Sequence, residues 1–358
     1  MHLPPENPLR APLPPDWPAP EALGFGQYLG PYLVETQHRD GHWTAPSLTP
    51  RAASPVQLAS GALQYGLSVF EGLKAYRAPD DRIHLFRPLA HARRLQASAQ
   101  RLGMPVPPEA LCQLLCRLAV QVHAAFVPPH GRGALYPRPT LFAEEECLGL
   151  RAAKRHRLSV VVTACSDPPL KSLRLWAEPE LIRAAPGGLG AAKTGGNYAA
   201  GLGGLLRAKA QGYDDVAWLD AATHTQLGEA GTMNLFVQIG TEVLTPPLDG
   251  TILAGVTRDC VIGLLRDAGV SVHEMAVGLD DLATAEAAGQ LGAAFGTGTA
   301  ARVAAIDTIG NGVREIRFRD RGGLAAFVAE RLKQLQEGAT PRHASWREPV
   351  PVPGEAGA

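Results

Sequence analysis

Hydrophobic and polar positions follow two different periods along this chain, and together they predict a mixture of strands and helices. Short apolar runs bounded by glycine, proline or aspartate are typical of strands. The clearest runs are 133–143, 157–165, 172–176, 215–220, 234–239 and 243–250. Apolar residues recur at helical spacing in 92–102, 109–126, 198–210, 257–268 and 324–336. The pattern therefore predicts an α+β or mixed α/β chain, arranged in two domains.

Turn residues add detail to this pattern. The runs 68–77 and 82–87 are joined by Ala-Pro-Asp-Asp and predict a hairpin, and Asn311-Gly312 predicts a second hairpin. Thr257 should cap the helix that follows it, and Gly269 should end that helix. We find no internal repeat.

Prolines mark the two ends of the chain. Eight of the first 23 residues are proline, and the end of the chain from Pro341 has a similar composition, so we expect extended arms outside the core. Ser166–Ser172 is polar and contains proline, which favours an interdomain linker. The predicted parts are an arm at 1–23, a small domain at 24–165, a linker at 166–172, a large domain at 173–340 and a tail at 341–358.

Composition and charge limit the classes of partner. The 358 residues contain 34 Lys plus Arg and 34 Asp plus Glu, which gives no reason to expect nucleic acid or an anionic membrane as a partner. No apolar run is long enough for a membrane span, and the N-terminus lacks the plan of a secretory signal. The five cysteines fit reduced thiols, and no metal-ligand set accompanies them. We therefore expect a cytoplasmic protein that acts on small molecules.

The stretch APGGLGAAKTGGNYAAGL (185–202) places Lys193 among glycines and alanines. Glycine allows close approach by a ligand, and a lysine in an apolar pocket loses affinity for its proton and becomes a nucleophilic amine. Such an amine forms an imine with an aldehyde. The alternative, considering this stretch alone, is a glycine-rich surface loop with a solvated lysine.

Three further segments could bind the same ligand. GVTRDC (255–260) and FGTGTAA (295–301) offer N–H and hydroxyl donors for a phosphate, with a plain helix cap as the alternative for the first. EAGTMN (229–234) places a carboxylate at a strand edge, and Arg94 could reach inward from its helix, although both residue types are more often solvated. An amine, a phosphate anchor and a carboxylate for a ring nitrogen are together what pyridoxal 5′-phosphate (PLP) requires.

Longer motifs resemble one known family. They are YGLSVFEGLKAYR (65–77), FRPLAHARRL (86–95), LYPRPT (135–140), KTGGNY (193–198), EAGTMNLF (229–236), TPPLDGTILAGVTRD (245–259) and FGTGTAA. In this order they resemble the branched-chain amino acid aminotransferases, which are fold-type IV PLP enzymes. The resemblance implies a smaller N-terminal α/β domain and a larger, barrel-like C-terminal α/β domain. It also implies a homodimer or higher homo-oligomer.

The resemblance also implies a role for each site residue. Lys193 would form the Schiff base with PLP and then act as general base and acid, while Glu229 pairs with the pyridine nitrogen and Tyr198 with the phenolic oxygen. Phosphate would be held by Arg94, Val256, Thr257 and Thr299. Substrate would be bound by Phe70, Tyr136, Arg138, Thr232, Ala300 and the partner's Tyr65.

Two departures from the family pattern matter. Pro137 stands in LYPRPT where an N–H is usual, which removes a ladder donor and puts the placement of Tyr136 and Arg138 in doubt. Ala301 and Ala304 stand where mammalian members have a redox cysteine pair, so thiol regulation of that kind is not expected.

The reaction implied is transfer of the amino group of leucine, isoleucine or valine to 2-oxoglutarate, which yields glutamate and branched 2-oxo acids. Alternatives with the same fold are a D-amino acid transaminase and an aminodeoxychorismate lyase. A non-catalytic cofactor-binding protein and a dinucleotide-binding module are more remote. The latter lacks the third glycine of its fingerprint.

Overall fold

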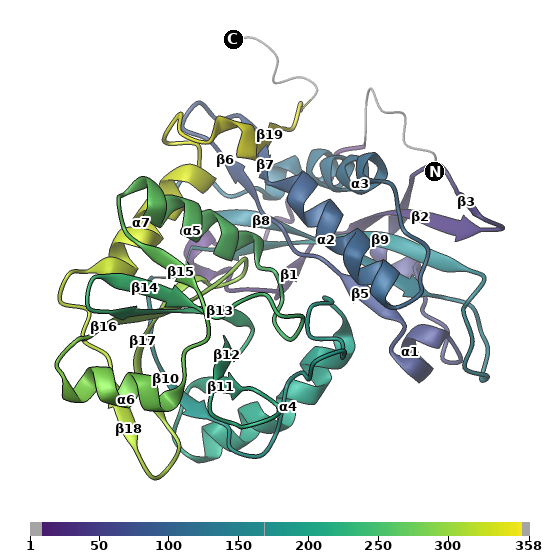
Figure 1. The fold of residues 1–358 in the computed structure, drawn as a ribbon. Helices are drawn as coiled ribbons and strands as arrows, with labels where there is room; N and C mark the ends of the chain where they lie inside the picture. The colour runs from purple at the N-terminus through teal and green to yellow at the C-terminus, as the bar shows by residue number, and fades with distance from the viewer. Residues whose placement is uncertain (1–8, 168, 353–358) are drawn as a thin grey trace. The chain divides into compact units, whose positions relative to one another are not determined.

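The computed structural model describes residues 9–167 and 169–352. Residues 1–8, 168 and 353–358, which belong to the predicted arm, linker and tail, lie outside the described residues. The chain forms two compact units. Unit 1 comprises the described residues of Met1–Pro168 and Gln334–Ala358 together with Ala192–Gly195, and unit 2 comprises those of Pro169–Ala191 and Gly196–Lys333. Figure 1 shows the course of the chain through both.

Unit 1 is built on a sheet whose strands run in the order β19-β7-β6-β8-β9-β2-β3, with β1, β4 and β5 paired at its sides. The long pair β8–β9 forms its centre, antiparallel from Gly133↔Ser166 to Ala143↔His156. The strands are β1 Tyr28–Leu29, β2 Tyr32–Arg39, β3 His42–Trp43, β4 Ser47–Pro50, β5 Ser68–Phe70, β6 Ala75–Arg77, β7 Ile83–Phe86, β8 Gly133–Ala143, β9 His156–Ser166 and β19 Arg347–Pro349.

Helices α1 Gly61–Tyr65, α2 Pro88–Arg101 and α3 Glu109–Val122 belong to unit 1, as do the 3₁₀ turns at Pro20–Ala22, Arg51–Ala53, Ala124–Phe126 and Ala344–Trp346. One face of α2 is buried through Ala92, Leu95 and Ala99, as their spacing predicts. The helix α3 is buried over most of its second half. These faces and the inner face of the sheet form one hydrophobic core.

The proline-rich ends take part in this core, which corrects the expectation of arms outside it. Ala11 and Leu23 are buried, and the Ala11 N–H donates to the Val122 carbonyl over 2.8 Å. At the other end, β19 pairs with β7, and Val350 and Val352 are buried. Prolines there limit the chain to edges and turns but do not prevent apolar neighbours from packing.

Unit 2 contains a closed ring of strands in the order β12-β11-β10-β17-β16-β13, because β12 pairs with both β11 and β13. β14 and β15 continue from β13, and β18 pairs with β17. The strands are β10 Ser172–Ala177, β11 Asp215–Leu219, β12 Leu227–Ala230, β13 Met233–Ile239, β14 Glu242–Thr245, β15 Val272–Glu274, β16 Leu291–Gly298, β17 Arg302–Gly310 and β18 Glu315–Arg317. The barrel-like α/β fold implied by the resemblance is thus confirmed for this sheet.

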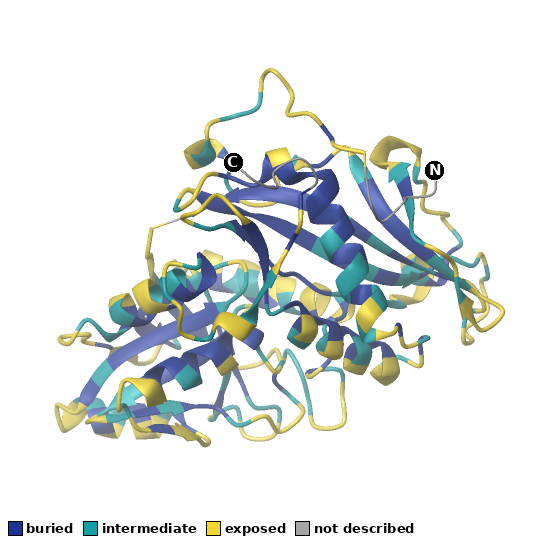
Figure 2. Ribbon diagram, turned by 90° about the horizontal axis from the view of Figure 1, so that it is seen from above, coloured by how far each residue is buried: buried dark blue, intermediate teal, exposed yellow. Residues whose placement is uncertain are grey.

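Four helices accompany this sheet: α4 Gly195–Ala210, α5 Val256–Asp267, α6 Leu279–Ala287 and α7 Leu324–Gln336. The residues of the barrel core are nearly all aliphatic or alanine, with Leu235, Val237 and Ile309 among the most deeply buried. Figure 2 shows that buried residues gather on the strands and on the helix faces that meet them.

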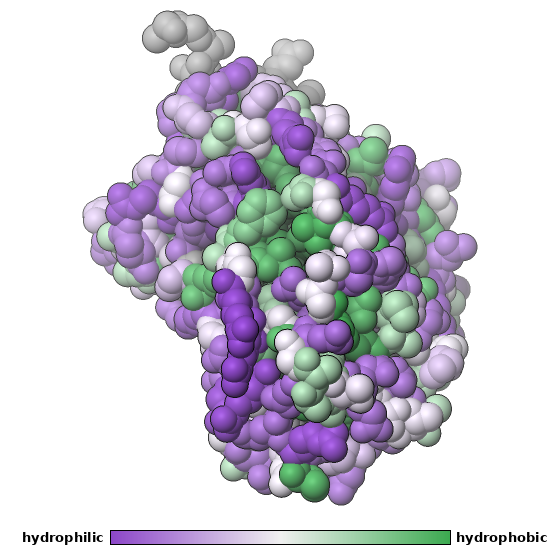
Figure 3. Space-filling view, turned by 60° about the vertical axis from the view of Figure 1, so that its left-hand side comes forward, coloured by the Kyte–Doolittle hydropathy of each residue, from purple (hydrophilic) through white to green (hydrophobic). Residues whose placement is uncertain are grey.

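Most predicted elements are confirmed to within a few residues. The run 133–143 is β8 and 324–336 is α7, and Gly312 has the positive φ of +82° expected at the Asn311-Gly312 turn between β17 and β18. The predicted hairpin 68–87 is confirmed only for β6 and β7, because β5 pairs with β8 instead. In the described part of the chain, no helix combines the length and the apolar character needed to cross a membrane. The face in Figure 3 is largely hydrophilic, interrupted by hydrophobic patches.

Candidate functional site

Lys193 lies in a four-residue segment that belongs to unit 1, although the chain on both sides of it belongs to unit 2. Its main chain is held at both polar groups. The Lys193 N–H donates to Ser98 Oγ over 2.9 Å, and its carbonyl accepts from the Phe70 N–H over 2.9 Å. Thr194 bridges to Val69 and is almost fully buried. The lysine is therefore fixed on a strand edge and does not lie on a solvated loop.

The Lys193 side chain lies against an aromatic face. Its Nζ is 4.9 Å from the centroid of the Phe70 ring, and the Arg138 guanidinium carbon lies 4.8 Å from that centroid. Two cations thus share one ring in a half-buried place. Contact with the negative face of the Phe70 ring helps to fix the position of the Lys193 amine.

Arg94 lies on α2 one turn before Ser98, whose hydroxyl donates to the Arg94 carbonyl over 2.9 Å. Its guanidinium forms a forked pair with Glu71: Nε to Oε1 is 2.6 Å and Nη2 to Oε2 is 2.9 Å. His91 Nδ1 donates to Glu71 Oε2 over 2.7 Å. Arg94 and His91 together hold the pKa of the Glu71 carboxyl far below its usual range despite complete burial. Ser98 thus connects the Arg94 turn to the backbone of Lys193.

Tyr136 and Arg138 project from the same face of β8. Arg138 Nη2 donates to the Tyr136 hydroxyl over 3.3 Å, and burial raises the pKa of that hydroxyl. Gly72 makes room for the tyrosine, because a Cβ there would lie 1.6 Å from the hydroxyl oxygen. The pair forms a polar end to the aromatic wall made by Phe70.

Pro137 does not disturb this strand. β8 pairs with β9 along its whole length, with Pro137 opposite Val162. The Pro137 carbonyl accepts from the Leu73 N–H over 3.2 Å. The ladder does not need an N–H at this position, so the doubt that Pro137 raised about the strand is removed.

Tyr65 ends α1 and is 38% exposed. Its hydroxyl donates to the Leu148 carbonyl in the loop between β8 and β9. The surroundings are unusually apolar for a surface, with Leu58, Leu148 and Leu150 all more than 70% exposed.

In unit 2, Glu229 is buried on β12 and held at both oxygens. Arg183 Nη2 lies 2.6 Å from Oε2, while the Asn234 amide and the Leu253 N–H each donate to Oε1 over 3.3 Å. Arg183 also donates to the carbonyls of Gly190 and Thr251. These donors fix the orientation of the buried carboxylate.

The strand register places the turn residues at one edge of the barrel. Glu229 lies opposite Asn234, and Asn234 lies opposite Thr297 on the next strand. The turns that contain Thr232 and Thr299–Ala300 follow directly at this edge, because β13 and β16 are antiparallel. Thr232 and Ala300 are exposed and Thr299 is half-buried.

The start of α5 lies beside the same row. Gly255 approaches Asn234 so closely that a Cβ would lie 1.9 Å from the amide oxygen. Gly255 is also the N-cap, and no side chain caps this helix. The prediction that Thr257 is the cap is therefore wrong: Thr257 lies inside the first turn, buried like Val256. An uncapped helix start keeps its N–H groups for an anion.

Tyr198 lies in the first turn of α4 and is 38% exposed. Thus unit 1 brings together Lys193, Phe70, Arg94, Tyr136 and Arg138, and unit 2 brings together Glu229, Thr232, Val256, Thr257, Thr299 and Ala300. Sequence reasoning missed Glu71, His91, Ser98, Arg183 and Asn234. A carboxylate within the apolar run of Val69 to Leu73 was a usable signal for Glu71, because a buried acid needs a partner.

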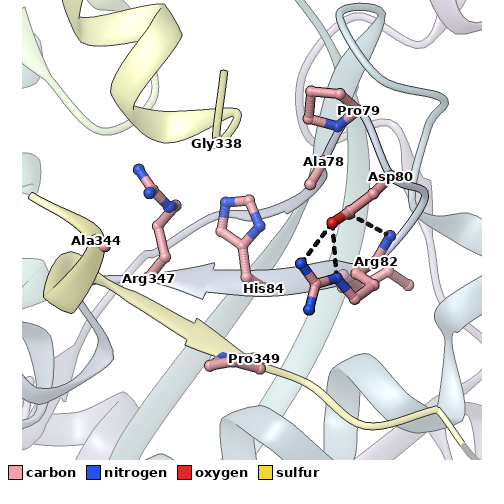
Figure 4. Close-up of a pocket in the computed structure, with 10 residues that line it drawn as sticks. Ala78, Pro79, Asp80, Arg82, His84, Gly338, Ala344, Arg347 and Pro349 are labelled. Carbon is pink, nitrogen blue, oxygen red and sulfur yellow. Dashed lines mark hydrogen bonds and ion pairs between the residues drawn. The ribbon is translucent and has the colours of Figure 1, made fainter. Parts of the chain in front are cut away.

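A cavity of about 370 Å³ lies elsewhere in unit 1, between the β6–β7 hairpin and residues 338–349 (Figure 4). His84 Nε2 donates to the Gln336 carbonyl over 2.7 Å, and Arg347 Nη1 donates to the Leu335 carbonyl over 3.1 Å. Both groups thus satisfy the end of α7. Arg82 is paired with Asp80. In residues 9–167 and 169–352, no group of three or more His, Cys, Asp or Glu could hold a metal ion.

Comparison with known proteins shows the family of this chain. Residues 68–303 match the family model described as amino-transferase class IV. The chain belongs to this family, and it is an enzyme of the aminotransferase class. Within the family it belongs with the branched-chain-amino-acid transaminases. It is 37% identical to branched-chain-amino-acid transaminase 1 of Bacillus subtilis over 336 residues, which cover 92% of this chain and 94% of that protein.

Solved structures show the same fold. The branched-chain aminotransferase of Thermoproteus uzoniensis with norvaline matches with a TM-score of 0.74 and 25% identity, covering 89% of this chain and all of that chain. A second branched-chain aminotransferase, complexed with N-(5′-phosphopyridoxyl)-L-glutamate, matches with a TM-score of 0.70 and 24% identity, covering 89% and 99%. The fold-type IV architecture is thus confirmed.

Proposed function

We propose that this enzyme transfers the amino group of leucine, isoleucine or valine to 2-oxoglutarate, with PLP bound covalently at Lys193 Nζ. The observation that carries the proposal is the placement of Lys193. Its backbone is bonded to Ser98 in the turn of α2 that carries the buried Arg94, and its amine lies over the Phe70 ring. An amine and a phosphate-binding cation are thus held by one helix turn.

The chain's residues fit PLP, which aminotransferases of this fold use. Lys193 offers the amine, Arg94 offers a buried guanidinium, and the uncapped α5 start at Val256–Thr257 offers N–H donors. Thr299 adds a hydroxyl, and Tyr198 is assigned to the phenolic oxygen. When bound, PLP supplies an electron sink for the charge that develops on the substrate α carbon.

Glu229 is proposed to hold a proton at the ring nitrogen. Support comes from its buried carboxylate, which Arg183 and Asn234 already orient. By holding that proton, the Glu229 carboxylate would act on the rate more than on binding.

Lys193 is proposed to move a proton at the substrate α carbon. A neutral amine close to the carbon serves as general base and then, protonated, as general acid.

The substrate site is proposed to lie between the Phe70 ring, which accepts an aliphatic side chain, and a polar end at Tyr136 and Arg138. Thr232 and Ala300 are assigned to the carboxylate side, and the partner's Tyr65 to the far wall. The norvaline complex of the Thermoproteus enzyme shows that a relative of this fold accepts an aliphatic amino acid.

A homodimer is proposed on the same grounds. Exposed leucines on both sides of Tyr65, at positions 58, 148 and 150, form an apolar surface of the kind that a second copy covers. The test of the reaction is an amino-donor panel with 2-oxoglutarate as acceptor. We expect turnover with the three branched-chain L-amino acids and none with D-alanine. Turnover of D-alanine or aminodeoxychorismate alone, or a yellow but inert protein, would contradict the proposal.

A further inference from the structure

We propose that Glu71, supported by His91, is the positioning residue that orients Arg94 for the cofactor phosphate. The inference rests on the proposed function, because it takes Arg94 as a phosphate ligand. It concerns two residues for which the sequence pattern gave no role. All the contacts that carry it lie within unit 1.

The geometry of the pair fixes the guanidinium in its plane. Glu71 engages Nε and Nη2 with both carboxylate oxygens, so Nη1 points away from the fork. Both side chains are at least nine-tenths buried, which removes competition from water. An arginine held in this way need not lose rotamer freedom when the phosphate arrives.

His91 completes the clamp from the previous turn of α2. Its Nδ1 bonds Glu71 Oε2, which also accepts from Arg94 Nη2, so the carboxylate is held from two positions on one helix. The Gly72 N–H donates to the same oxygen over 3.2 Å. With its acceptor sites occupied by these donors, Glu71 is suited to orient Arg94 and not to contact a ligand itself.

Charge alone makes the opposite prediction, which gives the proposal a clear test. Glu71 offsets the charge of Arg94, so a purely electrostatic view expects tighter phosphate binding when Glu71 is neutralised. The positioning role expects weaker binding, because an unoriented guanidinium makes fewer good hydrogen bonds.

The experiment measures the dissociation constants of PLP and of pyridoxal, which lacks the phosphate, for the full-length protein and its Glu71→Gln variant. We expect PLP binding to weaken by roughly 10- to 100-fold, the usual effect of losing a charged hydrogen-bond partner. Pyridoxal binding should change by about twofold or less, which a general loss of structure would not produce. Tighter PLP binding, or equal losses for both ligands, would overturn the proposal.

Four further variants complete the test. Arg94→Gln should lose the same preference for PLP, and adding Glu71→Gln to it should cause no further loss. His91→Asn keeps a donor near the Nδ1 position and should weaken PLP binding less than Glu71→Gln does. If the Glu71→Gln variant does not fold, His91→Asn takes its place in the experiment. In that case, an unchanged preference of His91→Asn for PLP over pyridoxal overturns the proposal. Glu109→Gln, which removes the exposed partner of neighbouring Arg93, is the matched control and should change nothing.

Different results would overturn the positioning role of Glu71 and the assignment of Arg94 to the phosphate. A loss in Arg94→Gln but not in Glu71→Gln overturns the positioning role and leaves the phosphate site in place. An unchanged PLP preference in Arg94→Gln overturns the phosphate assignment of Arg94 and the positioning role with it.

Discussion

Arg183 and Glu229 form a 2.6 Å ion pair in which the arginine exposes 12% of its side chain and the glutamate 6%. Arg183 also donates to the carbonyls of Gly190 and Thr251, so it connects the segment before Lys193 to the loop before α5. Gly190 permits this approach, because a Cβ there would lie 2.3 Å from the Thr251 carbonyl oxygen. One arginine thus supports both the carboxylate and the chain around it.

Removing this arginine should destabilise the protein. Arg183→Met leaves a buried carboxylate without its cation, which costs about 3 kcal/mol or more. The thermal midpoint should fall by several degrees, at roughly 2–4 °C per kcal/mol for a domain of this size. Arg174→Met is the control, because its pair with Glu315 is exposed and is worth about 1 kcal/mol or less. Equal midpoints for the two variants would contradict the role of Arg183.

Neutralising Glu229 should affect rate more than binding. Glu229→Gln keeps the shape and the Asn234 contact but cannot hold a proton at the ring nitrogen. We expect turnover to fall by roughly 100-fold or more while PLP remains bound. Steady-state kinetics together with the bound-cofactor spectrum measure the two effects separately. The exposed Glu242→Gln serves as control, and a small rate effect at position 229 would mean that the ring nitrogen has another partner.

Burial lowers the pKa of His123 from 6.5 to about 4, because its ring is fully enclosed and its Nε2 has no hydrogen-bond partner among the described residues. Below pH 6.5 the unfolded state therefore binds a proton that the folded state does not, and stability falls as the pH falls towards 4. The slope is about 1.4 kcal/mol per pH unit.

Between pH 6.5 and pH 5, this residue should lower the free energy of unfolding by about 2 kcal/mol. The thermal midpoint should consequently fall over the same interval. His123→Asn retains a donor for the Ala119 carbonyl, which Nδ1 now contacts at 2.8 Å, but does not titrate. That variant should lose less stability than the natural chain over the same interval. If the thermal midpoints of the two proteins fell in parallel with pH, His123 would be protonated in the folded protein as well.

Mixed subunits test whether Tyr65 serves the partner's site. Lys193→Ala and Tyr65→Ala chains should each be nearly inactive, yet a hybrid dimer would contain one site with both native residues. Random mixing should therefore restore about a quarter of native activity. Mixtures no more active than their components would show that Tyr65 acts within its own chain or not at all.

Periodicity predicted the elements well where the local pattern is unambiguous. The apolar run 133–143 and the helical spacing in 324–336 correspond to β8 and α7 residue for residue. The ends of the chain were harder, because composition reports the prolines but not the partners of Ala11 or Val350, which are remote in sequence.

For the candidate site too, some residues could be predicted from the sequence and some contacts could not. Lys193, Arg94 and Glu229 stand in motifs that the sequence displays. The pairing of Arg94 with Glu71 instead joins α2 to the segment between β5 and β6, 23 residues earlier. Thr257 was misassigned because a hydroxyl near a helix start is usually its cap, and here Gly255 takes that position. No local signal marks the passage of Ala192–Gly195 into unit 1.

The central point to test is which lysine binds PLP covalently. Lys193→Ala should fold but lose turnover by roughly 100-fold or more. Lys171 is exposed, and Lys171→Ala should keep its turnover. The decisive measurement is borohydride reduction of the PLP-loaded protein, followed by mass analysis of its peptides. We expect a phosphopyridoxyl group on the peptide that contains Lys193. Its presence on another lysine, or on none, would show that Lys193 is not the reactive residue.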